Sequence, residues 1–301
     1  MLLREISGGS TADNADAAKQ ALVLATMELY APVLRFAQFY SAPGNADAPR
    51  KADTTSGGTN RAIDDDYPEN NVTPDFGSVT LAIFGDEVRT DRAHVRRGET
   101  IEQVRVRSIE SFAKNLGKNL QYQIFNGNAT TNALQMNGIL TLATKSSQLI
   151  SFGSVCNTST TAVQLAYAIK NACLDISGGA EFIAMPQGVL STLSANVTSL
   201  VTYAPNALGG FIPSIDGIPI VISGKDSQGN DTLPWSSGNN GKIVIGRFGE
   251  KADITLMTNI GLEVKNLGLV GVHYTDSVEL DAGLTILDDN AVRIIKDITY
   301  A

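Results

Sequence analysis

A polar stretch of about 60 residues, between Phe36 and Gly98, constrains the fold of this chain more than any other feature. It has almost no core-forming periodicity, and structureless connections longer than about 12 to 15 residues are uncommon inside compact domains. It carries three consecutive carboxylates, Asp64, Asp65 and Asp66. It returns with the strand-like alternation of Val79, Leu81 and Ile83. A compact monomer offers such a stretch little to pack on, so we expect an extended arm that is ordered on another subunit.

A long helix is predicted directly after this stretch, from Glu99 to Phe125. Thr100 and Gln103 have the spacing of a capping box, which predicts the start of the helix. The pair Asn126-Gly127 predicts a left-handed stop. One apolar stripe runs at helical spacing through Ile109, Phe112, Leu116, Leu120 and Ile124. At 1.5 Å per residue the helix is roughly 40 Å long, which is enough to form the spine of a broad, flat subunit.

The first 36 residues contain a second predicted helix, from about Ala12 to Leu29. The sequence shows no evident partner within the chain for the apolar side chains of Leu22, Met27 and Tyr30. We therefore expect these three side chains to face another subunit.

Several passages, taken in order, resemble the major capsid proteins of tailed bacteriophages, whose Hong Kong 97-type fold encapsulins and herpesvirus capsid floors share. The order and spacing of the passages carry the resemblance, and no single one does. The passages are Pro32–Ala37, Phe76–Leu81, Glu99–Gly127, Asn137–Leu140, Ala184–Gln187, Asp216–Val221, Ile243–Phe248 and Val292–Lys296.

The resemblance implies an α+β subunit with a Hong Kong 97-type capsid fold. Its parts would be an N-terminal arm, an extended β-hairpin loop, a peripheral domain with a long spine helix at 99–125, and an axial domain. The corresponding ranges are 1–36, 37–98, 99–178 with 262–301, and 179–261. In the peripheral domain we expect a strand at Ile139–Leu142 and a helix near Thr161–Ile176.

Composition limits the classes of protein that this chain can represent. With 301 residues and 43% apolar content, it can form two core-bearing regions. It has 23 Lys and Arg against 31 Asp and Glu and no polybasic tail. Proteins that condense nucleic acid need Lys and Arg to displace counterions from phosphates, so we expect only weak, non-specific contact with packaged DNA. The two cysteines, Cys156 and Cys173, indicate buried thiols more than a disulfide.

No catalytic, cofactor-binding or metal-binding constellation stands out. His94 and His273, the only histidines, lie outside any cluster of Cys, Asp or Glu at ligand spacing. The loop 227–231 lacks the distal glutamate of a calcium loop, and 238–242 lacks the Ser or Thr that follows the lysine of a phosphate loop. We expect no enzyme and no cofactor. The longest apolar stretch near the start is interrupted by charges and a proline, so it predicts no membrane span.

An arginine cluster follows the polar stretch, at Arg89, Arg92, Arg96 and Arg97, with Arg105 and Arg107 soon after. Arginine suits interfaces because its planar fork can hold a carboxylate with two hydrogen bonds. One interpretation pairs the cluster with Asp64, Asp65 and Asp66 of a neighbouring copy. The other is a solvated surface that Glu87, Glu102 and nearby carboxylates neutralise locally. The sequence does not decide between them.

The resemblance implies a structural protein, the major capsid subunit of a tailed phage, assembled in the host cytoplasm and located in the virion capsid. Its expected partners are further copies in pentamers and hexamers, a portal, a separate scaffolding protein and packaged DNA, with no membrane. A decoration protein is a further candidate partner. Some related capsids join a loop lysine to a neighbour's asparagine, and Lys51 is the only lysine between Lys19 and Lys114, but nothing in the sequence assigns it that chemistry.

Two features at the start of the chain lead to a further expectation. No scaffolding segment precedes the arm, and the bulky Leu2 protects Met1 from removal. We therefore expect the mature particle to keep its N-terminus.

Two alternative functions stay open. The first is an encapsulin-type nanocompartment shell, which has the same fold but encloses proteins. The second is a soluble α+β enzyme or binding module whose site the sequence does not reveal. Particle size separates a shell from such a module.

Overall fold

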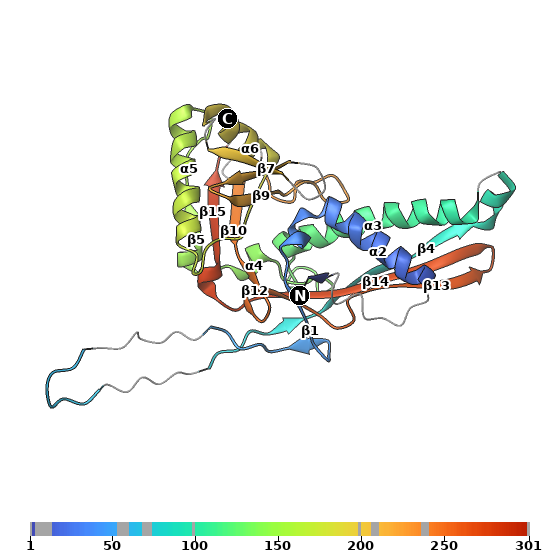
Figure 1. Cartoon of the computed structure of the whole chain (residues 1–301), viewed down its shortest axis with the longest axis horizontal. Coiled ribbons are helices and arrows are strands. Elements are labelled where there is room, and N and C mark those ends of the chain that lie inside the picture. Colours follow the sequence, from blue (N-terminus) through green and yellow to red (C-terminus); the bar gives the residue numbers. More distant parts are fainter. Residues whose placement is uncertain are drawn as a thin grey trace.

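The computed structural model describes residues 2–3, 14–52, 60–67, 74–97, 100–197, 200–205, 211–235 and 241–299. Two β-sheets and the helices beside them form the body, and a long loop projects from it (Figure 1). The described helices include α2 (Asn14–Tyr30), α3 (Ile101–Asn126), α4 (Ile139–Leu142), α5 (Ser159–Leu174) and α6 (Gln187–Asn196). Short 3-10 turns are η1 (Pro32–Arg35), η2 (Arg92–Arg97), η3 (Ser146–Gln148) and η4 (Asp289–Ala291).

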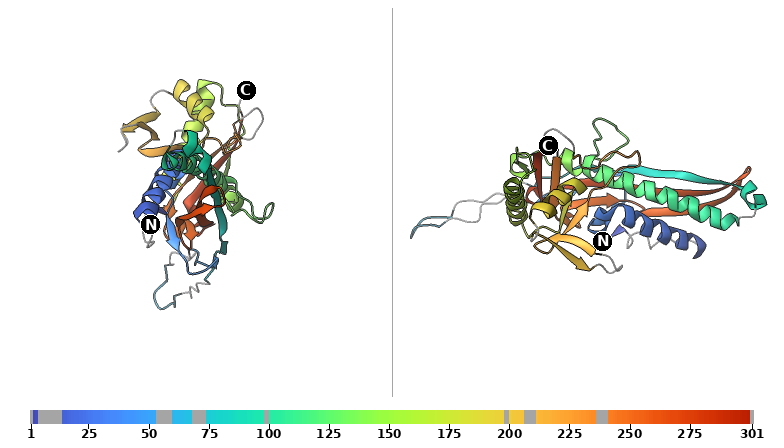
Figure 2. Two further views of the ribbon diagram at one scale, coloured as in Figure 1. Left: turned by 90° about the vertical axis from the view of Figure 1, so that its right-hand side faces the viewer. Right: turned by 90° about the horizontal axis from the view of Figure 1, so that it is seen from above.

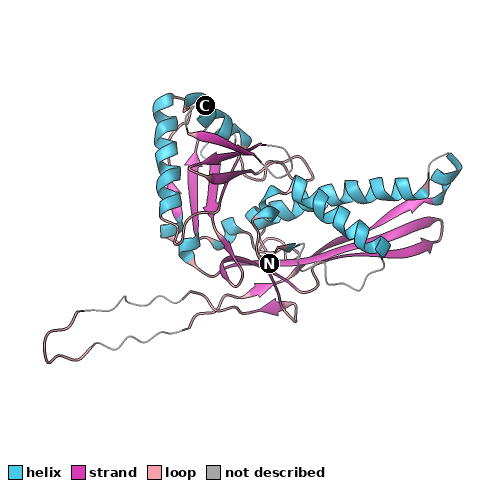
Figure 3. Cartoon of the chain, in the orientation of Figure 1, coloured by secondary structure: helices cyan, strands magenta, loops and turns pink. Residues whose placement is uncertain are grey.

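The six-stranded sheet follows the order β1-β12-β14-β13, with β4 paired to β14 and β11 paired to β12. Its strands are β1 (Phe39–Ser41), β4 (Ala82–Asp91), β11 (Phe248–Gly249), β12 (Ala252–Thr258), β13 (Leu262–Val270) and β14 (His273–Ile286). The long strands β4, β13 and β14 form a twisted ribbon that extends away from the rest of the body, beside α3 and α2 (Figures 1 and 3).

The seven-stranded sheet follows the order β5-β15-β10-β6-β9-β8-β7. Its strands are β5 (Leu149–Ser151), β6 (Phe182–Met185), β7 (Val201–Pro205), β8 (Phe211–Ile215), β9 (Ile218–Ile222), β10 (Gly241–Gly246) and β15 (Val292–Ile298). All four residues of β6 are buried, because the strand is covered on both faces. Phe182 and Ala184 pack into the core that contains α2 and α3, whereas Ile183 and Met185 pack into a second core with α5 and α6. The β6 strand therefore joins the two cores.

The predicted long helix is present as α3, and its apolar stripe explains its position. Ile109, Leu116, Leu120 and Ile124 are buried against α2 and the long strands. Thr100 is the N-cap residue, but its side chain makes no capping hydrogen bond, so the expected capping box is wrong. Gly127 ends the helix in an extended conformation, with φ −52° and ψ 141°, and not in the expected left-handed one. A β-carbon there would lie 2.2 Å from the Met136 carbonyl oxygen, so close packing requires the glycine.

The helix α2 confirms the predicted helix near the N-terminus, but its surroundings differ from the expectation. It lies alongside α3 (Figure 2), and Gly117 of α3 allows this close approach, since a β-carbon there would lie 3.0 Å from the Met27 Cα. Met27 is completely buried, Leu22 is half-buried and Tyr30 is exposed. The expectation that this helix lacks a partner within the chain is therefore wrong, and Met27 is not available to another subunit.

Two predicted strands need correction. Ile139–Leu142 is one turn of helix, α4, because a four-residue apolar run fits either structure and only its packing decides. The alternation of Val79, Leu81 and Ile83 does not persist, since β3 (Val79–Thr80) ends before Leu81 and β4 begins after it. The break shifts the register, and Ile83 is therefore 79% exposed while Ala82 and Phe84 face the core.

The two sheets cut across the predicted domain ranges. The strand β15, expected beside the spine helix, pairs with β10 and β5 in the seven-stranded sheet. The strand β12, expected in the axial range, pairs with β14 in the six-stranded sheet. Likewise, only the middle of 37–98 projects from the body, because β1 and β4 are integrated in the six-stranded sheet. Contacts between residues distant in the chain, which a linear division cannot show, produce these differences.

Candidate assembly surfaces

The projecting loop, defined here as residues 42–78, is an antiparallel ribbon at its base. The strand β2 (Ala46–Asp47) pairs with β3, and Arg50 bridges Phe76. Farther out, the Lys51 amide donates to the Asp75 carbonyl at 2.9 Å, and the Ala52 amide donates to the Leu287 carbonyl at 2.8 Å. The first contact joins the two sides of the loop, and the second fastens the loop to the segment after β14. The direction in which the loop leaves the body is thereby fixed.

An ion pair reinforces this base. The Lys51 Nζ lies 2.7 Å from an Asp75 carboxylate oxygen. Its hydrogen bond is the main reason that the pKa of Asp75 lies below its usual value. Lys51 is thus occupied within its own chain, and its role as a cross-linking group has no support here.

The described tip of the loop, residues 60–67, is exposed throughout. Arg61 holds it in a turn by donating hydrogen bonds to the carbonyls of Ala62 and Asp65 at 3.2 and 3.1 Å. The same guanidinium lies over the Tyr67 ring, 5.0 Å from its centroid. Ile63 is 93% exposed beside the three predicted carboxylates, Asp64, Asp65 and Asp66. An ordered turn therefore presents one large apolar side chain and three acidic ones to the surroundings.

The predicted arginine cluster lies at the other end of the molecule, near the end of β4 (Figure 1). Within one chain it cannot meet the loop tip, so a contact between the two stays a prediction about neighbouring copies. Arg89 is exposed and pairs with Glu87 on the same strand, as the alternative of local neutralisation predicts. Arg92 is exposed. The side chains of Arg96 and Arg97 lie outside the described residues.

Arg105, which the sequence places near the surface cluster, belongs to a buried ion network. Its guanidinium donates two hydrogen bonds to the Asp276 carboxylate, at 3.0 and 2.7 Å. Lys19 reaches the same carboxylate at 2.8 Å. Burial alone would raise the pKa of Asp276, but the hydrogen bonds from Arg105 and Lys19 outweigh burial and lower the pKa. The network connects α2, α3 and β14, and it could not be predicted from the sequence because Asp276 lies 171 positions from Arg105.

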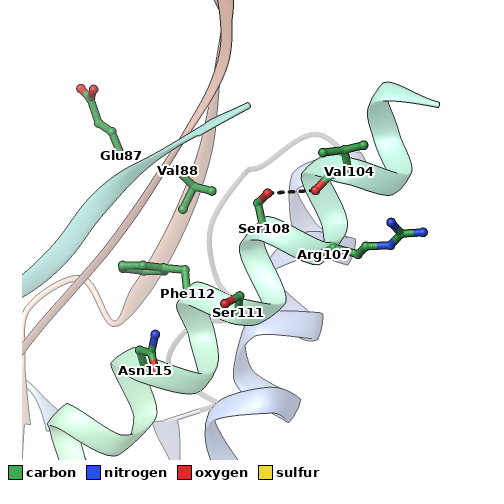
Figure 4. Close-up of a pocket in the computed structure, with 8 residues that line it drawn as sticks. All are labelled: Glu87, Val88, Val104, Arg107, Ser108, Ser111, Phe112 and Asn115. Carbon is green, nitrogen blue, oxygen red and sulfur yellow. Dashed lines mark hydrogen bonds between the residues drawn. The ribbon is translucent and has the colours of Figure 1, made fainter. Parts of the chain in front are cut away.

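A groove lies between β4 and α3 (Figure 4). Its apolar part comes from Val88, Val104 and Phe112, and its polar part comes from Glu87, Arg107, Ser108, Ser111 and Asn115. Ser108 is held in place by a hydrogen bond to the Val104 carbonyl at 3.0 Å. The groove thus combines an apolar floor with one cation, one carboxylate and several hydroxyl and amide groups. The sequence did not reveal it, because only the pairing of β4 with β14 sets the strand beside the helix.

The end of β13 and the turn that follows it carry a second exposed apolar surface. Leu267, Leu269, Val270 and Val272 are between 46% and 54% exposed. Exposed apolar side chains that lie together in this way are typical of surfaces that contact another protein.

The described part of the chain gives little support for a metal site, a reactive cysteine or a membrane span. No group of three or more His, Cys, Asp or Glu there could hold a metal ion. Cys156 and Cys173 are free and buried, as expected, and burial raises the pKa of Cys173 to about 11. Among the described residues, no helix is both long enough and apolar enough to span a membrane.

Neither a family model nor a curated protein matches the sequence. Solved structures do match in fold. The capsid of an empty GTA particle aligns with a TM-score of 0.61 at 14% identity, over 90% of each chain. The SrpI encapsulin from Synechococcus elongatus PCC 7942 aligns with a TM-score of 0.60 at 13% identity, over 89% of this chain and 87% of that chain. The capsid of cyanophage P-SCSP1u aligns with a TM-score of 0.55 at 12% identity, over 88% and 86%.

These likenesses cover nearly the whole chain and define its fold. The protein has the Hong Kong 97-type fold of capsid and encapsulin shells, and the resemblance seen in the sequence is confirmed.

Proposed function

We propose that this protein is the major capsid subunit of a tailed phage, a structural protein that assembles into pentamers and hexamers of an icosahedral shell. One observation carries the proposal. The projecting loop has a fully exposed tip, which presents Ile63 and three carboxylates that no described part of the chain covers. Assembly with further copies supplies such a surface and gives the loop a function.

The contact that we propose joins the loop tip of one copy to the β4–α3 groove of another. Ile63 would occupy the apolar floor at Val88 and Phe112, and the tip carboxylates would face Arg107, Ser108 and Ser111. The arginine cluster at the end of β4 would extend the positive side of this contact. Exposed charge pairs contribute only about 0 to 1 kcal/mol each, so the apolar part would give most of the affinity and the charges would set the orientation.

A phage capsid and an encapsulin shell share this fold, and two observations favour the phage capsid. The first 36 residues contain a helix, α2, that packs within the subunit. The net charge of −8 suits a wall that must release DNA after a motor has packed it. In this proposal the subunit works with a portal, a separate scaffolding protein and, as a further candidate, a decoration protein. It acts in the virion capsid after assembly in the host cytoplasm, without catalysis.

Electron microscopy and light scattering of the expressed protein test the shell function directly. We expect closed particles in the megadalton range. A species no larger than a small oligomer at all concentrations and in the presence of a crowding agent contradicts the proposal. The contents of particles from infected or native cells then separate the alternatives. Nuclease-protected double-stranded DNA supports a phage capsid, and an enclosed protein without DNA supports an encapsulin shell.

A further inference from the structure

The helix α5 has two faces that carry apolar side chains. One face packs into the core with α6 and the seven-stranded sheet, and it includes Leu165 and Ile169. The helix lies at the margin of the molecule (Figure 1), and its other face is open. There Val163, Tyr167 and Leu174 are 37%, 64% and 83% exposed. A helix that covers a sheet needs only one apolar face, so the open face calls for a partner outside the described part of the chain.

The open face of α5 is a narrow stripe. Its members follow one another at intervals of four, three and four residues, and they are Val163, Tyr167, Lys170 and Leu174. At 3.6 residues per turn, the directions of these four side chains differ by only about 60°. Intervals of three and four residues are those at which one helix packs along another. The spacing of the stripe therefore points to a helix as its partner.

A groove lies beside the stripe, between α5 and the residues that follow α6. Its lining comes from Val163, Ala166, Tyr167, Lys170, Val197 and Leu200. Most of these side chains are apolar, and those of Ala166 and Leu200 are buried. The groove has a volume of about 290 Å³, whereas a cavity of about 150 Å³ is already large enough for benzene. A leucine side chain from a partner helix would therefore fit into it.

The stripe is complementary to a second copy of itself. An aliphatic residue stands at each end, with Tyr167 and Lys170 between them. Two copies of α5 can lie antiparallel about the point midway between positions 167 and 170. Val163 then lies opposite the second copy's Leu174, so two apolar side chains meet. Tyr167 lies opposite the second copy's Lys170, and an ammonium group over an aromatic ring is attracted to it. Such self-complementarity is what a two-fold contact requires.

Lys170 can take part in this contact while it keeps its partner in its own chain. Its Nζ donates to an Asp216 carboxylate oxygen at 3.0 Å. The aliphatic stem of a lysine covers apolar surface while its charged end stays paired. Asp216 also neutralises the ammonium group, so the two lysines of a pair would not approach each other as bare charges.

We propose that α5 is the site of an antiparallel two-fold contact between two copies of this chain. Four side chains from each copy make a contact at the low end of interface sizes, below about 1,200 Å², so the dimer would be weak and would form only at high concentration. Neighbours in a ring of five or six copies meet head to tail, so this contact is a different one. The inference goes beyond the shell function and does not depend on it.

Disulfide cross-linking of the unassembled full-length subunit tests the geometry. Val163→Cys and Leu174→Cys are prepared as separate variants and oxidised either alone or after mixing. Position 163 would lie opposite position 174 of the second copy, whereas the two copies of position 163 would be 11 residues, roughly 16 Å, apart along the helix. We expect cross-linked dimers in the mixture and not in either variant alone. The parent protein, whose Cys156 and Cys173 are buried, measures the background. No cross-link in the mixture, or equal cross-linking of one variant alone, overturns the proposed pairing.

Sedimentation equilibrium of the same subunit measures the affinity. Leu174→Gln should weaken self-association at least tenfold, because it removes an apolar contact that occurs twice in a two-fold dimer. Leu134→Gln is the matched control, since Leu134 is 82% exposed in the connection between α3 and α4, and it should associate like the parent protein. Both variants should unfold at the parent's temperature. A parent protein that is monomeric at every concentration, or equal association of the parent protein and Leu174→Gln, overturns the proposal and leaves the stripe to a contact inside a shell or to a different protein.

Discussion

Replacement of Asp276 by Asn tests whether the buried ion network holds the subunit together. The change removes one negative charge and keeps the size of the side chain. It leaves Arg105 and Lys19, whose side chains are only 5% and 11% exposed, without their shared carboxylate. Removal of one partner from a buried pair costs about 3 to 5 kcal/mol. Glu102 remains 3.2 Å from Arg105, but it is 65% exposed and offsets only about 0 to 1 kcal/mol.

We therefore expect Asp276→Asn to lower the free energy of unfolding by about 3 kcal/mol. Urea unfolding of the unassembled subunit measures this loss. Asp216→Asn is the control, since Asp216 and Lys170 are 57% and 39% exposed, and it should cost less than about 1 kcal/mol. A double variant with Arg105→Gln should lose less than the sum of the two single variants, because the residues are coupled. Equal losses for Asp276→Asn and Asp216→Asn would refute the reasoning.

The same network predicts a pH dependence. The pKa of Asp276 is lowered in the folded protein, so its contribution to stability is fully present above the unfolded pKa of about 3.9. It is lost as pH falls through the lower, folded pKa. The difference in stability between the parent protein and Asp276→Asn should thus be constant near neutral pH and shrink below about pH 4.

Three further predictions concern assembly. Changing the three tip aspartates to Lys should lower particle yield at low salt, with partial recovery at high salt because exposed charges are screened; normal assembly at every ionic strength would mean that these charges are only solvated. Ile63→Ser should reduce particle yield without changing the unfolding of the subunit, whereas Leu134→Ser, at a side chain that is 82% exposed elsewhere, should assemble as before; equal yields contradict the proposed anchor. Removal of residues 1–36 should destabilise the subunit itself, measured by its melting temperature, because α2 contributes to the core; a fully stable truncated subunit would disprove this.

The helices of this fold could be read from the sequence where their periodicity is long. The stripe from Ile109 to Ile124 predicts α3 closely, and α5 lies near its expected place. The prediction of a strand at Ile139–Leu142 was wrong because four consecutive apolar residues are too few to show either a helical or a strand period. The prediction of which β4 side chains face the core was wrong for a different reason. The strand is interrupted at Leu81, which changes which side chains face the core, and the alternation of residues in the sequence does not reveal such an interruption.

The candidate assembly surfaces could likewise be predicted only in part. The acidic tip and the arginine cluster are visible as charges that are close together in the sequence. Assigning partners to them requires the fold. Arg105 was predicted near the surface cluster but is buried, because it pairs with Asp276, which is distant in the sequence. Met27 was predicted to face another subunit but is buried within its own chain, because Gly117 of α3 allows the two helices to approach closely there. In both cases a partner within the chain replaced the expected partner in another subunit.

The low identity of the fold matches bears on how assembly must be encoded. At 12% to 14% identity, TM-scores of 0.55 to 0.61 are maintained over nearly the whole chain, so the fold is shared although most residues differ. Core positions tolerate many apolar substitutions if volume and patterning are kept. In the proposed assembly, contacts between copies would have less freedom, because each tip would have to fit the groove that its own sequence builds. The partner that we propose for Ile63 therefore lies on the surface of this chain itself, at the β4–α3 groove, which offers an apolar floor beside Arg107 and Glu87.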